Sequence, residues 1–192
     1  MSLRRGFAPA RLRWPALLAA LLLVPFGCAA DAPLKRPLPA FTATSPAAWL
    51  NSPPLRVESL RGKVLLLDVW TFECWNCYRS FPWLGDVERR FADEGLQVIG
   101  IHAPEFERER DADAVQRKAD EFGLHHPIMI DNDLRYWRAL DNHYWPAFYL
   151  VDRRGFIRRR FVGETHAGSA QAASIEQAIA ALLAEAPETS AP

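Results

Sequence analysis

The sequence has few cysteines, and their number limits the chemistry that the chain can support. Cys28, Cys74 and Cys77 are the only ones among 192 residues. A zinc site needs three or four ligands. Cys28 lies in a segment that we expect to be removed or lipidated, so only two thiols remain. We therefore expect no bound metal, and the sequence gives no reason to expect a cofactor.

The chain also lacks an excess of charge of either sign. It contains 23 Lys and Arg residues and 23 Asp and Glu residues. Four of the basic residues precede Cys28: Arg4, Arg5, Arg11 and Arg13. The rest of the chain therefore has 19 basic and 23 acidic residues, a net charge of −4. Nucleic-acid binding depends on positive charge, so we do not expect it. The charged run over 105–111 is expected to be a solvated loop and helix start.

Internal repeats, a glycine-rich phosphate loop and a long hydrophobic run are absent as well. The apolar run over 14–24 is shorter than a typical membrane-spanning helix. It follows a basic start and precedes small residues, so residues 1–28 are interpreted as a secretory signal. Export places the protein outside the cytoplasm, in an oxidising compartment such as the periplasm, where we expect it to be attached to a membrane.

The end of this signal leaves two processing routes open. Gly27-Cys28 resembles the end of a bacterial lipobox, although Pro25 stands where that motif usually has Leu. Cys28 is then acylated and becomes the N-terminus of a lipoprotein, which accounts for the odd third cysteine. The alternative is simple cleavage near Ala29 or Ala30, and an uncleaved anchor is the minor option.

The other two cysteines lie between a predicted strand and a predicted helix. Residues 64–70 form an almost continuous apolar run, which is typical of a strand buried on both faces. Apolar residues then recur at helical spacing, at Phe81, Leu84, Val87 and Phe91. Cys74 falls at the first turn, where unpaired N–H groups and the helix dipole stabilise a thiolate and lower its pKa. Cys77 lies on the same helix face, within reach of a disulfide but more enclosed.

The C-x-x-C spacing in this context favours redox activity over a structural bridge. A disulfide that closes so short a loop restricts the unfolded chain little. Asp68 interrupts the apolar run, and burial there would raise its pKa and let it accept the proton of Cys77 during exchange. The alternative is an exposed Asp at the strand end. Pro82 is expected to kink the helix, and Glu73 is expected to be solvated.

These residues resemble the thioredoxin superfamily, and more narrowly the membrane-attached periplasmic TlpA/ResA-like and DipZ-type domains. The segment LRGKVLLLDVWTFECWNC resembles the strand, buried acid, Trp and C-x-x-C of that family. Asn76 precedes the second cysteine, as in the DipZ-type branch. The likeness covers about residues 40–185. Trp75-Asn76 replaces the Gly-Pro of thioredoxin itself, which leaves the direction of electron flow open.

Three further features match the family pattern. Pro82 stands at the position of the kink proline, and Gly163 follows a predicted strand. Trp145-Pro146 precedes another strand, where the family has a cis-proline opposite the disulfide. The resemblance therefore implies that Pro146 packs against the disulfide and belongs to the catalytic site with Cys74, Cys77 and Asp68.

The resemblance implies an α/β fold of the thioredoxin type, with a central mixed β-sheet flanked by helices. It further implies an N-terminal β-hairpin, placed at 49–57, and a central βα insertion, placed at 127–140. We expect a flexible tether over 29–48, the folded domain over 49–186 and a frayed tail over 187–192. Periodicity predicts a strand over 97–103, an edge strand over 156–161, and helices over 113–122 and 174–183.

The resemblance also implies thiol–disulfide exchange with partner proteins. Cys74 would attack a partner's disulfide, and Cys77 would resolve the mixed disulfide. We expect a reductase, which needs an electron donor such as a membrane thiol transporter, while an oxidase role stays open. Trp70, Trp75 and Trp145 are expected to form the surface on which a substrate lies.

Two other functions stay open at this point. Thr71-x-x-Cys74 echoes a peroxiredoxin motif and suggests a thiol peroxidase, although Leu67 replaces the proline of that motif. A copper carrier of the Sco type would use both thiolates and a nearby histidine such as His143, although that family has C-x-x-x-C. His102 is a second histidine that would lower a thiol pKa if it approached the cysteines.

Overall fold

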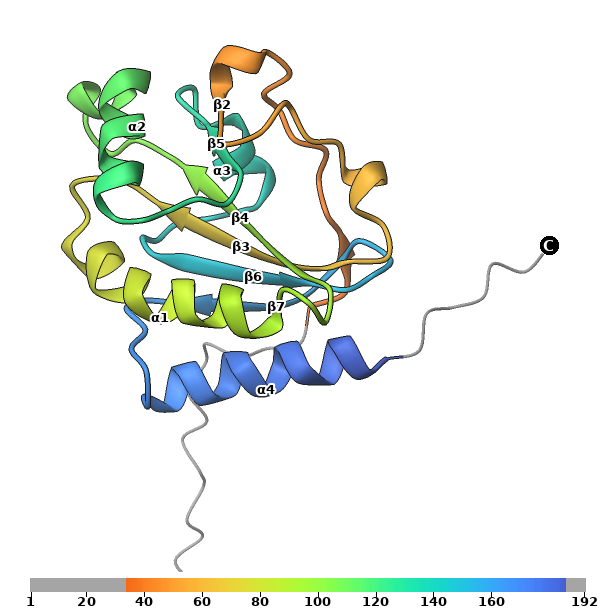
Figure 1. The fold of residues 1–192 in the computed structure, drawn as a ribbon. Helices are drawn as coiled ribbons and strands as arrows, with labels where there is room; N and C mark the ends of the chain where they lie inside the picture. The colour runs from red at the N-terminus through yellow and green to blue at the C-terminus, as the bar shows by residue number, and fades with distance from the viewer. Residues whose placement is uncertain (1–33, 186–192) are drawn as a thin grey trace, which may run out of the picture.

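A seven-stranded mixed β-sheet forms the centre of the protein (Figure 1). The computed structural model describes residues 34–185. The strands lie in the order β1-β7-β6-β3-β4-β5-β2, and the middle strand β3 pairs in parallel with β4 and antiparallel with β6. Their bounds are β1 (Arg36–Pro37), β2 (Trp49–Leu50), β3 (Val64–Trp70), β4 (Leu96–His102), β5 (Ile128–Ile130), β6 (Ala147–Val151) and β7 (Phe156–Val162).

Helices and loops cover both faces of this sheet. The helices are α1 (Trp75–Phe91), α2 (Ala112–Glu121), α3 (Arg135–Ala139) and α4 (Ala170–Ala184), with short 3-10 helices η1 (Pro46–Ala48), η2 (Val57–Leu60) and η3 (Glu107–Arg110). Buried side chains of α1, α2 and α4 form one core layer, and those of α3, η2 and the N-terminal segment form the other. Figure 1 shows α1 and α4 on the same side of the sheet.

Strand β3 needs an apolar sequence because it is buried on both faces. All seven of its residues are buried. Side chains alternate along a strand, so Leu66 and Trp70 enter the layer with α1, whereas Leu65 and Leu67 enter the layer with α3. This confirms the strand that we predicted over 64–70, and the chain then passes directly to α1 and the two cysteines.

The N-terminal segment corrects the expected tether from residue 34 onward. Arg36 and Pro37 pair with β7. Leu38 and Phe41 are buried, and the Phe41 ring meets Trp49 edge to face at 5.3 Å between centroids. Burial of this apolar surface holds the segment on the sheet. The earlier part of the expected tether lies outside the described residues.

The expected hairpin over 49–57 is wrong. Strand β2 pairs antiparallel with β5 instead, with Trp49 opposite Met129. The chain then forms η2, which begins at Val57. Both Trp49 and Val57 are buried in the layer on the α3 side of the sheet. Packing on the sheet thus buries both side chains.

Helix α3 is shorter than the helix expected within 127–140. The carboxylate of Asp131 accepts hydrogen bonds from the N–H groups of Tyr136 and Trp137, at 3.0 and 2.7 Å. These bonds cap a helix that starts at Arg135, and Leu134 before it has a left-handed backbone with φ of 56°. Tyr136 is buried, as expected of a residue on the inner face.

Helix α4 begins earlier than the expected range of 174–183. The Ser169 hydroxyl accepts a hydrogen bond from the Ala172 N–H at 3.1 Å. Serine is a favoured N-cap, so it fixes the start of the helix at Ala170. The helix that we predicted over 113–122 and the strand over 97–103 are confirmed within one residue as α2 and β4. Strand β7 is confirmed near the sheet edge, but β1 covers its first two residues.

Several expectations lie outside the described residues. These are the secretory signal, the lipidation of Cys28 and the frayed tail over 187–192. Among the helices of residues 34–185, none is both long enough and apolar enough to cross a membrane.

Candidate active site

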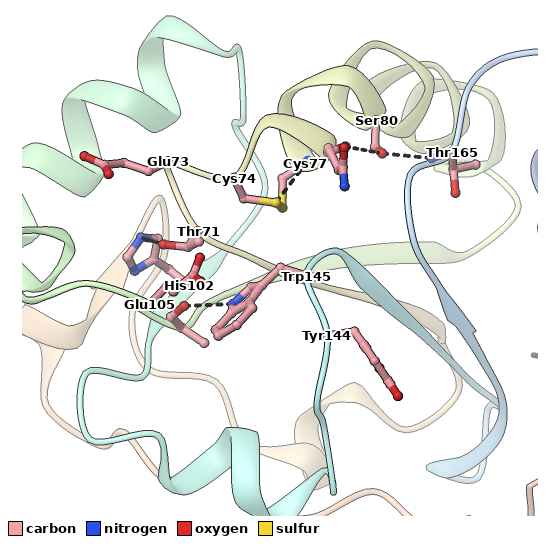
Figure 2. The surroundings of a disulfide bond; sticks show 12 residues. Thr71, Glu73, Cys74, Cys77, Ser80, His102, Glu105, Tyr144, Trp145 and Thr165 are labelled. Atoms are coloured by element: carbon pink, nitrogen blue, oxygen red, sulfur yellow. Dashed lines mark hydrogen bonds between the residues drawn. A yellow bond between two sulfur atoms is a disulfide. The ribbon is translucent and has the colours of Figure 1, made fainter.

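Cys74 and Cys77 form a disulfide at the N-terminus of α1, with their Cα atoms 5.2 Å apart (Figure 2). Cys74 is the N-cap residue, and its sulfur accepts a hydrogen bond from the Cys77 N–H at 3.2 Å. Cys77 is fully buried, whereas Cys74 is partly exposed. The helix N-terminus therefore stabilises negative charge on the sulfur that solvent reaches.

The loop that carries the cis-proline lies across from the disulfide in Figure 2. The Trp145–Pro146 peptide bond is cis, as the resemblance implied. Two hydrogen bonds fix the loop: the Trp145 indole donates to the Ala103 carbonyl at 2.9 Å, and the Gly163 N–H donates to the Pro146 carbonyl at 2.9 Å. The loop is thus tied to the end of β4 and to the end of β7.

Asp68 lies in the middle of the sheet and is fully buried. Its carboxylate has no hydrogen-bond partner among residues 34–185. Burial disfavours the charged form and raises the pKa of Asp68 from 3.8 to about 8. Asp68 alternates with Leu66 and Trp70 along β3, so its side chain faces the layer that contains Cys77. An exposed Asp at a strand end, the alternative from sequence, is therefore excluded.

The three tryptophans expected at a substrate surface have different environments. Trp75 is 68% exposed, directly beside Cys74. Trp145 is partly buried, and its ring packs against the Trp137 ring at 4.2 Å between centroids, with the two planes tilted by 34°. Trp70 is fully buried and meets Phe81 edge to face, so it cannot contact a substrate. The expectation for Trp70 was wrong because its side chain leaves β3 on the face that packs against α1.

The two histidines that we considered do not contact the sulfurs through any hydrogen bond within residues 34–185. His102 is fully buried, and burial lowers its pKa to about 3. Its Nε2 lies 3.4 Å from the Thr71 hydroxyl. His143 is exposed, and its ring lies 3.2 Å from the Asp141 carboxylate.

Glu73, next to Cys74, is exposed but has a partner. Its carboxylate binds the Arg108 guanidinium, which lies on η3. The hydrogen bonds from Arg108 hold the pKa of Glu73 below its ordinary value. The charge beside the disulfide is therefore balanced by a cation from another loop.

Sequence reasoning missed two side chains that hold the site. The Ser80 hydroxyl donates to the Asn76 carbonyl at 2.9 Å and accepts from the Thr165 N–H at 2.9 Å, which joins α1 to the loop after β7 (Figure 2). Glu109, within the charged run that we expected to be solvated, is fully buried. It accepts a hydrogen bond from the Thr71 hydroxyl at 2.6 Å. Nothing in the spacing of that run distinguishes Glu109 from its exposed neighbours.

Among the described residues, no contact supports the two alternative functions, a thiol peroxidase and a copper carrier. The hydroxyl of Thr71, the residue on which the resemblance to a peroxiredoxin motif depends, donates to Glu109. Within residues 34–185 there is no group of three or more His, Cys, Asp and Glu side chains that could hold a metal ion.

Comparisons with known proteins identify relatives of this arrangement. The sequence model of the Redoxin family matches residues 34–179. The chain is 41% identical over 119 residues to Protein DipZ of Mycobacterium tuberculosis, a match that covers 60% of this chain. It spans only 17% of the length of DipZ.

A shorter relative and a solved structure match along nearly their whole length. The chain is 28% identical over 152 residues to thiol-disulfide oxidoreductase YkuV of Bacillus subtilis, covering 79% of this chain and 97% of YkuV. The solution structure of a thioredoxin-like protein in the oxidized form superimposes with a TM-score of 0.66 and 28% identity, covering 80% of this chain and 98% of that one. The expected thioredoxin-like fold is confirmed.

Proposed function

The chain belongs to the redoxin family, and on this premise we propose that it is a thiol–disulfide oxidoreductase that exchanges its Cys74–Cys77 pair with cysteines of partner proteins. One observation carries the proposal: a partly exposed sulfur at a helix N-terminus is bonded to a buried sulfur three residues later. The exposed sulfur can meet a partner, and the buried one can only react with the first.

The first step is attack by the reduced protein. The Cys74 thiolate attacks one sulfur of a partner's disulfide, and that disulfide breaks. The other partner sulfur leaves as a thiolate, which solvent protonates. A mixed disulfide now joins Cys74 to the partner. The N–H of Cys77, which donates to the Cys74 sulfur in the disulfide form, supports the attacking thiolate before this step.

The second step releases the partner. Cys77 gives its proton to Asp68 in its ionised form, which is the minor form at pH 7 because the pKa of Asp68 is about 8, and attacks the Cys74 sulfur, which forms the Cys74–Cys77 disulfide. The partner's second sulfur leaves and takes a proton, so the partner has gained two electrons and two protons. Asp68 suits this role because it faces the layer of Cys77 and its pKa of about 8 lies near neutral pH.

The surface around Cys74 suits a protein substrate. Trp75 and Tyr144 are 68% and 52% exposed, and both belong to the segments that flank the disulfide. Exposed aromatic rings contribute contact area with little loss of conformational entropy. Together with the partly exposed Trp145, they offer an apolar surface for the residues on either side of a partner's disulfide, and the buried cis Pro146 lies beneath the Trp145 end of the loop.

We further propose that the chain works outside the cytoplasm as a reductase, attached to a membrane. The secretory signal predicted over 1–28 supports this location. An oxidising compartment does not reduce such a pair by itself, so a membrane thiol donor would regenerate it. Measuring the reduction potential against glutathione tests the direction: a strongly oxidising potential would exclude the reductase.

Trapping tests the assigned roles of the two cysteines. In Cys77→Ser the mixed disulfide cannot resolve, so partners stay bound to Cys74 and can be released by dithiothreitol and identified by mass spectrometry. Cys74→Ser is the matched control and should capture none. Capture by Cys74→Ser alone would show that the roles are reversed, and capture by neither would contradict the proposed exchange.

A further inference from the structure

The buried carboxylate of Glu109 binds the turn that leads to the attacking cysteine. Its Oε1 accepts hydrogen bonds from the Thr71 hydroxyl at 2.6 Å and from the Glu73 N–H at 3.0 Å. The same turn is closed by the Cys74 N–H, which donates to the Thr71 carbonyl at 3.3 Å. One oxygen of Glu109 therefore holds two points of the turn, and the second point is the residue before Cys74.

The other oxygen of Glu109 binds the loop after β4. Oε2 accepts from the N–H groups of Glu105 and Phe106, each at 2.7 Å. The Glu109 N–H in turn donates to the Phe106 carbonyl at 3.1 Å. The carboxylate thus joins two loops that follow neighbouring strands, β3 and β4.

Four groups donate hydrogen bonds to Glu109, and both of its carboxylate oxygens must therefore act as acceptors. Three of them are backbone N–H groups, which can only donate, and the fourth is the Thr71 hydroxyl. A carboxylate accepts at both oxygens, whereas an amide has one oxygen and one NH2 group. The Thr71 hydroxyl can also accept from an NH2 group, but a backbone N–H cannot, so replacing Glu109 by Gln would leave at least one backbone N–H facing another donor.

We propose that Glu109 is a positioning residue for Cys74, which fixes the turn before it and opposes its thiolate through a buried negative charge. This inference rests on the proposed function, in which Cys74 is the attacking thiol. It gives the fold a second influence on the nucleophile, because the N-terminus of α1 favours the thiolate and Glu109 disfavours it.

The size of the effect follows from backbone dimensions. The Glu73 N–H bonds the carboxylate, so the Cys74 sulfur lies no more than about 12 Å from it. At that distance and an effective dielectric constant of about 20, a unit charge raises a thiol pKa by about one unit. The other charged or titratable groups on the surrounding elements stay the same in the test below: Asp68, Glu73 with Arg108, Arg79 with Glu164, His102 and His166.

The test compares Glu109→Gln with Glu107→Gln on reduced protein. Glu107 lies on the same 3-10 helix, but its side chain is 89% exposed and pairs with Arg110. The substitution Glu107→Gln therefore removes one negative charge and leaves the hydrogen bonds to the turn before Cys74 in place. The alkylation rate of Cys74 by iodoacetamide, measured from pH 5 to 10, gives its pKa. The rate of amide hydrogen exchange at Glu73 reports whether its N–H is still hydrogen-bonded to residue 109.

The expected result separates the two variants. In Glu109→Gln the Cys74 pKa falls by about one unit, and alkylation at pH 7 speeds up about threefold, because the larger thiolate fraction outweighs its lower nucleophilicity. The Glu73 amide exchanges at least tenfold faster. In Glu107→Gln both quantities stay at the wild-type values. A Cys74 pKa in Glu109→Gln that equals the wild-type value, or exceeds it, overturns the inference.

Thr71→Val decides the outcome if Glu109→Gln does not fold. It removes one of the four hydrogen bonds and keeps the charge. Glu73 amide exchange at least threefold faster than wild type, with no fall in the Cys74 pKa, supports the inference, and unchanged exchange overturns it. Alkylation of Cys77 before Cys74 in the wild-type protein would instead refute the proposed function itself.

Discussion

Asp68→Asn should stabilise the protein, by an amount that grows with pH. Asp68 is fully buried, and desolvation raises its pKa from 3.8 to about 8. Between these values the folded protein keeps a proton that the unfolded chain has released. The free energy of unfolding therefore falls as pH rises through this window, and the loss is complete above pH 8.

The magnitude follows from the size of the shift. Each pH unit inside the window costs about 1.4 kcal/mol, and pH 7 lies about 3 units above 3.8. Asp68 thus lowers the stability at pH 7 by about 4 kcal/mol relative to a neutral group. Asparagine has nearly the same shape and cannot ionise. The variant should be about 4 kcal/mol more stable at pH 7 and equal to wild type near pH 3.5.

Urea unfolding of the oxidised protein at several pH values between 3.5 and 9 measures this difference. Asp93→Asn makes the same substitution at an exposed position and should match wild type throughout. A stability difference between Asp68→Asn and wild type that does not change with pH would refute the reasoning, because it would show that the carboxyl has the same pKa in both states. The variant should also resolve mixed disulfides more slowly, since Cys77 loses its proton acceptor.

Three further substitutions test other parts of the structure. In Gly100→Ala the new Cβ would lie 3.0 Å from an Ile128 carbon and 3.1 Å from the Trp70 indole nitrogen, so urea unfolding should show a loss of about 1–3 kcal/mol. Trp75→Ala should lower kcat/KM for reduction of a protein disulfide about tenfold. Its kcat/KM for glutathione disulfide and its Tm should stay unchanged. Equal losses of kcat/KM on both substrates would contradict a role of Trp75 in protein binding. His102 has a pKa lowered from 6.5 to about 3, so wild type should lose stability as pH falls below 6.5, because the unfolded chain takes up a proton that the buried ring does not. His102→Gln should lose less over that range in the same urea series, and parallel curves would contradict the burial of a neutral ring.

The sequence was most informative where one strand and one helix determine the site. The apolar run over 64–70 and the helical spacing from Phe81 to Phe91 place Cys74 at a helix start, and both patterns depend on local geometry alone. The cis bond before Pro146 came only from the family resemblance, because a proline by itself does not specify its isomer.

Features that depend on long-range packing were not predictable. Glu109 belongs to a run of charges, and only the approach of the loops after β3 and β4 buries it. Leu38 and Phe41 have no periodic pattern, so nothing in the sequence shows that they pack on the sheet. Trp70 was expected near the substrate, since its position along the chain gives no indication of which face of β3 it occupies.

The short strands β1 and β2 have a consequence for how partners can bind. They come from one N-terminal segment, yet they pair with β7 and β5 at opposite margins of the sheet. An extended peptide that added itself as a further strand would have to displace one of them, or align beside the arginines of β7. A shortened protein that starts at residue 49 would uncover the β7 margin and the apolar contacts of Leu38 and Phe41, which invites aggregation during purification.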